Sequence, residues 1–254
     1  MSRRTELDLA AEAARAAGAR LRELFEGEKD ILSEAGRDIK LQADRDSEQI
    51  IVERLQRDGR HPILAEEGGA YGAAEGAFWV IDPLDGTLNF SRGFPLCCVS
   101  IGLVEGERPV LGVIYDFTRD ELFAGAAGEG AWLNGRAIRA SERTDRAQAV
   151  LATGLPTFTD FSDAALLDFV RLMGSFKKPR CIGSAALSLA GVASGRFDAY
   201  AEDHIMLWDV AAGAALVEAA GGYVSLEPSG RRDWARIVRV AGRAEIWAER
   251  EGRS

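Results

Sequence analysis

The sequence is organised around one stretch that joins an apolar segment to a polar corner: WVIDPLDGTLNF, residues 79–90. Residues 78–81 are apolar, with β-branched and aromatic side chains, which predicts a buried strand. The strand is expected to end at Asp82, because Pro83 has no backbone N–H with which to continue a ladder. Asp82 and Asp85 then flank a tight corner. The pattern therefore places two carboxylates at the end of a buried strand.

Gly86 and Thr87 follow the second of these acids and mark the expected start of a helix. Backbone N–H groups at a helix start can hold an anion, and neighbouring carboxylates can hold a hard cation. Asp82 and Asp85 also have a simpler interpretation, as caps of an ordinary strand-to-helix turn. The stretch alone leaves both interpretations open.

Two further segments also carry acids where a predicted strand ends or a predicted helix begins. The segment ILAEEG, residues 63–68, is an apolar strand that runs into Glu66 and Glu67. The segment LWDVAAG, residues 207–213, places Asp209 at the start of an Ala-rich helix. Each segment therefore delivers a carboxylate at the end of a strand or at the start of a helix.

In this order, the three segments resemble the inositol monophosphatase family of magnesium-dependent, lithium-sensitive phosphatases. The family signature Asp-Pro-(Ile/Leu)-Asp-Gly-Thr-x-Asn-Phe is matched without a gap at residues 82–90. The second signature, Trp-Asp-x-Ala-(Ala/Gly)-(Gly/Ala), is matched at residues 208–213. The resemblance extends from about residue 38 to about residue 223. Such a match is far more specific than a lone glycine motif.

Length and composition indicate a globular protein with room for a large core, as one domain or as two closely packed lobes. The chain has 254 residues, of which 47% are apolar and 28% are charged. Its formal net charge of −9 argues against a surface built for nucleic acid. An acidic protein that binds phosphate esters needs metal cations or a local basic site to overcome charge repulsion.

Cysteine and histidine usage narrows the class further. The three cysteines are an odd number with two adjacent (Cys97, Cys98 and Cys181), so no disulfide framework is indicated and a reducing compartment is favoured. The two histidines, His61 and His204, make a Cys/His zinc cluster unexpected. No apolar run approaches the ~20 residues of a membrane span, and the charged N-terminus lacks a signal-peptide core. We therefore expect a cytoplasmic protein that does not bind membranes.

Periodicity predicts two leading helices followed by a run of strands. The helices are expected at residues 5–26 and 44–56, joined by a charged connector at residues 28–40. Strands are expected at residues 62–65, 78–81, 96–104, 110–115, 121–124, 131–133 and 136–138, with a glycine-rich connection at residues 68–76 and the hairpin signal Asn134-Gly135. Meandering strands favour an antiparallel sheet covered by the two helices. These elements define a first lobe of α+β type at residues 1–146.

After residue 146 strands and helices alternate. Strands are expected at residues 149–153, 180–182, 197–201, 223–226 and 245–248, and helices at residues 164–173, 184–193 and 208–220. This alternation predicts a second lobe, of α/β type, at residues 147–254. The resemblance implies that the lobes form a layered α-β-α-β-α sandwich of the sugar phosphatase type, with the site between them.

The resemblance also implies a metal site built from acids and one backbone carbonyl. Glu66, Asp82 and the Leu84 carbonyl would hold a first Mg²⁺ ion. Asp82, Asp85 and Asp209 would hold a second, with Asp82 as the bridging ligand. Mg²⁺ takes oxygen ligands, often one or two carboxylates together with water and substrate phosphate. Without cations, these acids would repel one another.

Hydrolysis of a phosphate ester then needs a water nucleophile, charge neutralisation and a stabilised leaving oxygen. By resemblance, Thr87 and Glu66 orient and deprotonate the water, and Asp44 acts through Thr87 or through a third, weaker Mg²⁺ ion. Asp44 also suits a plain structural role, because a helix dipole favours an acid in the first turn. The N–H groups of Gly86 and Thr87 would hold phosphate oxygens. Glu67 is expected beside the ligands or exposed.

Two further stretches are expected to contact the alcohol part of the substrate. One resembles a family turn whose backbone contacts hydroxyls, and it also suits an ordinary helix start: Gly183-Ser184-Ala185. Glu202 lies seven residues before Asp209, the spacing at which the family carries an acid that binds ring hydroxyls; the alternative is a surface acid. Asp203 and His204 depart from the small residues expected there, which puts a sugar or inositol preference in doubt.

The sequence therefore predicts a Mg²⁺-dependent phosphomonoesterase that acts on a small polyol or sugar phosphate, with inositol monophosphate as the leading candidate. The nearest alternative is a sibling phosphatase that acts on histidinol phosphate, fructose bisphosphate or adenosine 3′,5′-bisphosphate. A different class is a regulatory protein that keeps the fold and binds another macromolecule. The intact set of acids argues against this class, because binding alone does not need them. The resemblance also implies a homodimer.

Overall fold

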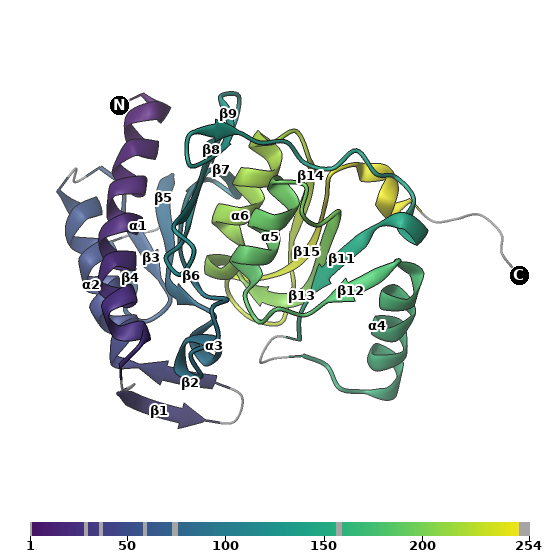
Figure 1. The fold of residues 1–254 in the computed structure, drawn as a ribbon, viewed down its shortest axis with the longest axis horizontal. Helices are drawn as coiled ribbons and strands as arrows, with labels where there is room; N and C mark the ends of the chain where they lie inside the picture. Colours follow the sequence, from purple (N-terminus) through teal and green to yellow (C-terminus); the bar gives the residue numbers. More distant parts are fainter. Residues whose placement is uncertain are drawn as a thin grey trace, which may run out of the picture.

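The structure is a computed structural model that describes residues 2–27, 30–35, 38–57, 60–72, 76–155 and 159–248. Helices and sheets are stacked in alternating layers, with central helices between two sheets and further helices outside each sheet (Figure 1). This arrangement confirms the predicted layered sandwich. The division of the chain at residue 146 stays a prediction.

The first large sheet has the strand order β10-β9-β8-β7-β6-β5-β3-β4. In chain order its strands are β3 (Ile63–Ala65), β4 (Gly69–Tyr71), β5 (Ala77–Asp85), β6 (Cys98–Glu105), β7 (Arg108–Asp116), β8 (Glu121–Ala126), β9 (Gly130–Leu133) and β10 (Arg136–Ala137). Neighbouring strands are antiparallel except β3 and β5, which are parallel. The carboxyl ends of β3 and β5 therefore lie at the same edge of the sheet.

Helices α1 (Arg3–Phe25) and α2 (Gln42–Gln56) cover one face of this sheet, with α1 on β6, β7 and β8 and α2 on β5. The residues of α1 that face the sheet recur at helical spacing: Leu7, Ala10, Ala14, Ala17 and Leu21 are buried, and Phe25 is half-buried. The helix begins before the predicted residue 5 because Ser2 is the cap. The Ser2 hydroxyl accepts a hydrogen bond from the Thr5 N–H at 3.3 Å.

The second large sheet has the strand order β12-β11-β13-β15-β14. Its strands are β11 (Val150–Thr153), β12 (Lys178–Arg180), β13 (Ala199–Met206), β14 (Tyr223–Pro228) and β15 (Ala235–Ala241). Strand β11 is parallel to β12 and β13, and β15 is antiparallel to β13 and β14. Helix α4 (Asp163–Ser175) lies against the outer face of this sheet (Figure 1).

Helices α5 (Ala185–Ala193) and α6 (Leu207–Ala219) fill the space between the two sheets. Helix α6 contacts β5, β6, β7 and β8 on one side and β13, β14 and β15 on the other. Every residue of α5 is buried, as are most of those in α6, which explains why these helices are apolar on all sides. The core thus holds α6, and with it the acid in its first turn, firmly between the sheets.

Several predicted boundaries were wrong. The expected strand at residues 245–248 is a short 3₁₀ helix, η2 (Ala244–Trp247), and the missed strand is β15, whose apolar run is interrupted by Arg236 and Arg239. Strand β5 continues through Pro83 to Asp85 rather than ending at Asp82. The pairing of β5 with β6 shifts register between Asp82 and Asp85, where Pro83 has no N–H to donate.

The two connectors contain more structure than predicted. In the charged connector, β1 (Ile31–Ala35) and β2 (Asp38–Leu41) form an antiparallel hairpin. In the glycine-rich connection, β4 pairs with β3. Within these connectors, residues 28, 29, 36, 37 and 73–75 lie outside the described residues. The remaining short elements are α3 (Thr87–Ser91) and the 3₁₀ helix η1 (Arg146–Gln148).

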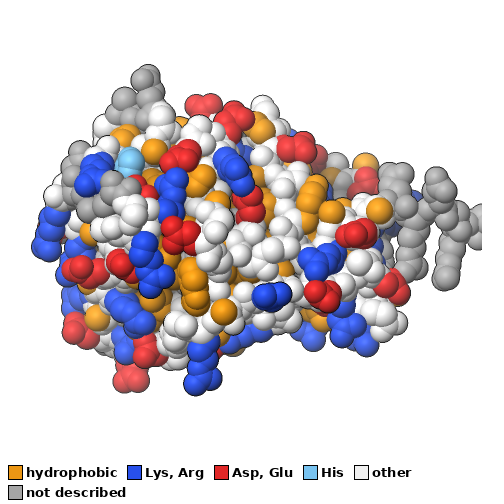
Figure 2. Space-filling view, turned by 90° about the horizontal axis from the view of Figure 1, so that it is seen from above, with side chains coloured by type: hydrophobic (Ala, Val, Ile, Leu, Met, Phe, Trp, Pro, Cys, Tyr) orange, Lys and Arg blue, Asp and Glu red, His pale blue; other side chains and the backbone are white. Residues whose placement is uncertain are grey.

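The surface is mixed in charge. On the face shown in Figure 2, Lys and Arg side chains are interspersed with Asp and Glu side chains, and hydrophobic side chains are scattered between them. Mixed charge of this kind produces no large field of one sign across the face. Among the described residues, no helix is both long enough and apolar enough to cross a membrane.

Candidate active site

The end of β5 forms a tight polar corner. Asp82 is buried, and its Oδ1 accepts a hydrogen bond from the Leu84 N–H at 3.0 Å. Gly86 has φ = 89° and would place a Cβ 2.7 Å from the Leu96 carbonyl oxygen, so a larger residue cannot occupy this turn without displacing backbone. Helix α3 then begins at Thr87, as predicted. The corner is therefore fixed by backbone geometry as well as by its acids.

Three acids from three elements converge beside this corner. Glu66 follows β3, Asp82 lies in β5, and Asp209 lies in the first turn of α6. One carboxylate oxygen from each lies within 4.8 Å of the other two. The parallel pairing of β3 with β5 brings Glu66 and Asp82 to one edge of the sheet, and a hydrogen bond of 3.2 Å from the Met206 N–H to Asp209 Oδ2 orients the third acid.

Asp85 is bound to the middle layer of helices. Its Oδ2 accepts a hydrogen bond of 2.6 Å from the Ser184 hydroxyl and one of 2.7 Å from the Ala186 N–H, both at the start of α5. Ser184 also caps α5 by accepting a hydrogen bond from the Leu187 N–H at 3.2 Å. The Cys98 thiol also lies 3.8 Å from Oδ2 of Asp85, so the three side-chain and backbone donors share this oxygen, and Oδ1 is the one that a ligand in the cleft would use.

The acids carry an electrostatic penalty that a cation would relieve. Burial, and next the neighbouring carboxylates, raise the pKa of Glu66 to about 8 and hold the pKa values of Asp82 and Asp209 well above the ordinary range. Burial also raises the pKa of Asp85 to about 6. Oxygen atoms alone make up this donor set, as Mg²⁺ prefers. The residues present therefore fit a magnesium site.

Without metal, the protein is expected to lose stability as the pH rises from about 5 to about 8. Burial raises the pKa of Glu66 to about 8 and that of Asp44 to about 7, whereas unfolded carboxyls titrate near ~4. A raised pKa in the folded state gives stability that is present at low pH and is lost as the pH rises through the folded value.

Thermal unfolding in excess chelator across this pH window measures the effect. Each kcal/mol lost should lower Tm by roughly 2–4 °C in a protein of this size. Added Mg²⁺ should flatten the decline because it stabilises the ionised carboxylates. A Tm that rises with pH in the metal-free protein would contradict the assigned pKa values.

Asp44, which is buried, and Thr87, which is partly exposed, form a hydrogen-bonded pair beside the acids. The Thr87 hydroxyl lies 3.0 Å from Asp44 Oδ1 and 2.9 Å from the Leu84 carbonyl oxygen, and it can donate to either. Asp44 Oδ2 accepts a hydrogen bond from the Leu41 N–H at 2.7 Å, which ties Asp44 to the start of α2. The structural and chemical interpretations of Asp44 are therefore compatible, because one oxygen caps the helix while the other holds Thr87.

A cleft of about 790 Å³ opens above the acids and extends to the second sheet. Its lining includes Glu66, Asp85, Gly86, Thr87, Gly183, Ser184, Ala185, Glu202 and Asp209. Glu202 is buried, its Oε2 accepts a hydrogen bond of 2.6 Å from the Tyr200 hydroxyl, and burial raises its pKa to about 7. Gly183 packs against Asn89, whose side-chain amide donates to the carbonyls of Leu96 and Ile182. The interpretation of Glu202 as a surface acid is therefore wrong.

Sequence reasoning missed several residues of the cleft, among them Lys40 and Arg232. The Lys40 ammonium lies 2.9 Å from Oε2 of Glu67, so Glu67 pairs with a cation at the rim. The only sequence feature that could have indicated Lys40 is its position four residues before Asp44, a predicted site residue. Arg232, in the connection between β14 and β15, had no local signal.

Comparison with known proteins gives a consistent result. The model of the inositol monophosphatase family matches residues 3–251. The inositol monophosphatase 3 of Solanum lycopersicum is 40% identical over 232 residues, which are 88% of this chain and 86% of that protein. A protein of Xylella fastidiosa named Nus factor SuhB is 46% identical over 196 residues, which are 76% of this chain and 71% of that protein.

A solved structure has the same fold. The inositol monophosphatase from Anabaena (Nostoc) sp. superposes with a TM-score of 0.81 at 38% sequence identity. The match covers 97% of this chain and 94% of the Anabaena chain. Similarity thus extends over both sheets and all the elements that carry the acids.

Proposed function

Because the chain belongs to the inositol monophosphatase family and is a phosphatase, we propose that it is a Mg²⁺-dependent phosphomonoesterase of a small polyol or sugar phosphate, with inositol monophosphate as the leading candidate substrate. The observation that carries this proposal is the convergence of Glu66, Asp82 and Asp209 within 4.8 Å beside the Gly86 corner. Inhibition by Li⁺, a homodimer and a cytoplasmic location stay predictions.

The acids divide between two ions in this proposal. Glu66, Asp82 and the Leu84 carbonyl would hold one Mg²⁺, and Asp82, Asp85 and Asp209 would hold the other. Bound Mg²⁺ supplies charge neutralisation on phosphate oxygens and acidifies water. The positions of the acids support this division, because Asp85 is bound from the start of α5 while Glu66 follows β3.

The chain's own groups position the reacting atoms. In this proposal the Thr87 hydroxyl holds the attacking water, Asp44 holds the hydroxyl, and Glu66 takes the proton that the water gives up. Gly86 and Thr87 line the cleft, and in this proposal their N–H groups donate to phosphate oxygens.

Thr87→Val is expected to lower kcat about tenfold with little change in KM. Valine keeps the shape but has no hydroxyl, so the hydrogen bond that holds the attacking water is lost, and a neutral bond of this kind is worth about 0.5–1.5 kcal/mol. The matched control is Thr87→Ser, which keeps the hydroxyl beside Asp44 and should retain most of the activity. Steady-state kinetics on inositol 1-phosphate measure both variants. Equal turnover in the Val and Ser variants would mean that the hydroxyl has no part in positioning.

Glu202→Gln tests the substrate class. Oε2 of Glu202 is bound by Tyr200, and Oε1 remains for hydroxyls of the substrate. Hydrogen bonds that involve a charged group are worth roughly 1.5–3 kcal/mol, and Gln keeps the shape and one acceptor, so about half of this should be lost. We expect the ratio of kcat/KM for inositol 1-phosphate to that for glycerol 2-phosphate to fall about tenfold.

The two esters distinguish the possible roles of Glu202. Glycerol 2-phosphate can reach the acids without reaching Glu202, so its hydrolysis should hardly change. Equal losses on both esters would assign Glu202 to the support of the acids or of the fold. No loss on either would shift the preference to a sibling substrate, namely histidinol phosphate, fructose bisphosphate or adenosine 3′,5′-bisphosphate.

A regulatory role is the second candidate function, supported by the 46% identity to the protein named Nus factor SuhB. The enzymatic function requires the acids of the cleft to bind metal, whereas a regulatory function requires only a surface that binds another macromolecule. Release of phosphate from any of these esters by the purified protein would establish the enzymatic role. Absence of release from all of them in the presence of Mg²⁺ would favour the regulatory one.

A further inference from the structure

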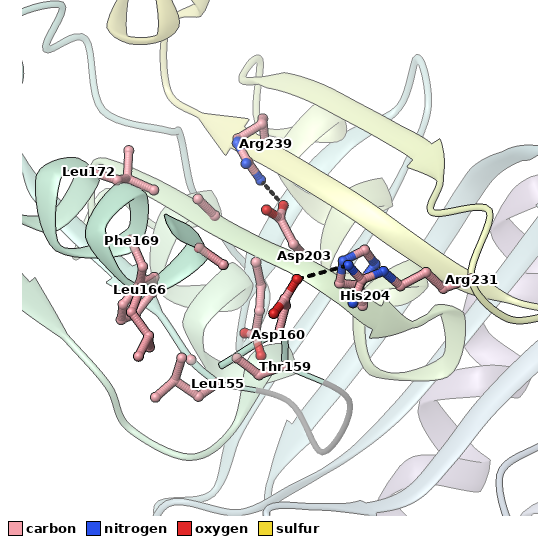
Figure 3. Close-up of a pocket in the computed structure, with 14 residues that line it drawn as sticks. Leu155, Thr159, Asp160, Leu166, Phe169, Leu172, Asp203, His204, Arg231 and Arg239 are labelled. Carbon is pink, nitrogen blue, oxygen red and sulfur yellow. Dashed lines mark hydrogen bonds and ion pairs between the residues drawn. The ribbon is translucent and has the colours of Figure 1, made fainter. Parts of the chain in front are cut away.

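A second cavity, of about 200 Å³, adjoins the cleft between α4 and the ends of strands in the second sheet (Figure 3). Four residues line both the cleft and this cavity: Gly154, Leu155, Glu202 and His204. The two spaces therefore meet beside Glu202, and none of Glu66, Asp82 and Asp209 lines the second cavity. The proposed chemistry uses none of the other residues that line the second cavity.

His204 lies at an irregularity in β13 that turns it toward this junction. The pairing of β13 with β15 shifts register between Asp203 and Ile205, and His204 has φ = 65°. A positive φ is uncommon for a residue other than glycine, and bulges beside active sites often redirect a side chain. His204 Nδ1 is buried and has no hydrogen-bond partner among the described residues. A polar atom of a ligand could supply that partner.

The walls of the cavity indicate what it can hold. Its apolar surface comes from the segment after β11 and from α4: Leu155, Ala165, Leu166, Phe169 and Leu172. Four of its charged groups form two ion pairs, since Arg239 lies 2.6 Å from Asp203 and Arg231 lies 3.1 Å from Asp160 (Figure 3). The remaining acid, Glu202, accepts a hydrogen bond from the Tyr200 hydroxyl, and burial raises its pKa to about 7. A pocket with apolar walls and paired charges favours an uncharged ligand group, because an extra charge would be buried without a partner.

Size limits that group to about one ring. An apolar cavity of about 150 Å³ in another protein accommodates benzene, so about 200 Å³ suits a six-membered ring with a small substituent. Gly154 keeps the passage open, because a Cβ at this position would lie 2.8 Å from Oε2 of Glu202. Glu202 can therefore bind hydroxyls in the cleft while the remainder of the alcohol continues past it.

We propose that this cavity is a specificity subsite for an uncharged, planar ring carried by the alcohol part of the substrate, and that His204 donates or accepts a hydrogen bond to a polar atom of that ring. The inference rests on the proposed function, because it assigns the position of the alcohol in the same cleft. It extends the proposed substrates from compact polyol phosphates to phosphate esters whose alcohol also carries a ring. In such an ester, Glu202 binds the hydroxyls and the ring lies beyond them, in the second cavity.

Three esters with the same reacting carbon test the subsite: glycerol 2-phosphate, its 1-O-benzyl ether and its 1-O-pyridylmethyl ethers. The wild-type protein should hydrolyse the benzyl ester with a kcat/KM at least about tenfold above that of glycerol 2-phosphate, as is usual for filling an apolar pocket. The best pyridylmethyl isomer should gain a further threefold to tenfold, because its nitrogen can bond to His204.

Matched variants locate the effect. Ala165→Phe fills the cavity from α4. It should bring the benzyl preference, which is the ratio of kcat/KM for the benzyl ester to kcat/KM for glycerol 2-phosphate, close to one. Its control is Ala164→Phe, at an exposed position of the same helix that does not line the cavity, and it should keep the wild-type preference. His204→Gly suits the positive φ and removes only the imidazole. It should keep the benzyl preference and lose the added preference for the pyridylmethyl ester.

The outcomes separate the subsite from the proposed function. Phosphate release from all three esters with equal kcat/KM in the wild type would overturn the subsite and leave the phosphatase assignment intact. A benzyl preference that persists in Ala165→Phe would also overturn it. An absence of release from every ester in the presence of Mg²⁺ would overturn both the subsite and the proposed function.

Discussion

Asp209→Asn is expected to lower kcat at least ~10²-fold while the protein keeps its fold, an effect of the size seen when one electrostatic stabiliser is removed. The Asp209 carboxylate lies with those of Glu66 and Asp82, where its charge would attract and orient a cation. Asparagine keeps the volume and one oxygen that can accept the hydrogen bond from the Met206 N–H. The loss should therefore fall on turnover rather than on stability.

The matched control for this variant is Glu218→Gln. Glu218 is an acid of the same helix, α6, but it pairs with Arg108 outside the cleft. Removal of its charge should leave kcat within about twofold, as for most surface substitutions. Steady-state kinetics at saturating Mg²⁺ and thermal unfolding of both variants provide the comparison. Near-normal turnover in Asp209→Asn would mean that the signature at residues 208–213 is only structural here.

The acids of the site could be predicted from sequence because local signals place each carboxylate at the end of an element and the family resemblance implies that these carboxylates form one site. An apolar strand that runs into acids, or an acid in the first turn of an apolar helix, places the carboxylate at the end of an element. The ends of β3 and β5 and the start of α6 are such places, and they lie together in the structure. The layered fold was also predictable, from the family resemblance.

The contacts that orient these acids could not be predicted. Asp85 is bound by Ser184, which lies 99 residues later, and such a pairing leaves no local pattern in the sequence. Strand β15 was missed because Arg236 and Arg239 interrupt its apolar positions. In the structure the Arg239 side chain reaches Asp203, so its charge serves a contact between β15 and β13 that only the folded chain reveals.

The second cavity was likewise beyond sequence reasoning. The departure at Asp203 and His204 was visible as an unusual pair of residues. Its consequence depends on the register shift in β13 and on the packing of α4, which are properties of the tertiary structure. Register shifts of this kind are common beside functional sites, where the local structure departs from regular strand geometry to position a side chain.

The proposed mechanism requires, above all, that phosphate release depend on Mg²⁺. Four acids have raised pKa values without a cation: Asp82 and Asp85, which are buried, and Glu66 and Asp209, which are partly exposed. An acidic cleft of this kind repels a phosphate ester. Removal of the metal should therefore abolish turnover and also lower the Tm, because a ligand bound only by the folded state stabilises it. Ca²⁺, which tolerates a larger and less regular coordination shell, should not substitute fully for Mg²⁺.

The most direct measurement is the rate of phosphate release from inositol 1-phosphate by metal-stripped protein, as Mg²⁺ is added back against a buffered chelator. The account predicts no release above background in excess chelator and a return of activity that saturates with free Mg²⁺. It also predicts that Tm rises over the same range of Mg²⁺ concentration. Full activity in excess chelator would contradict the account.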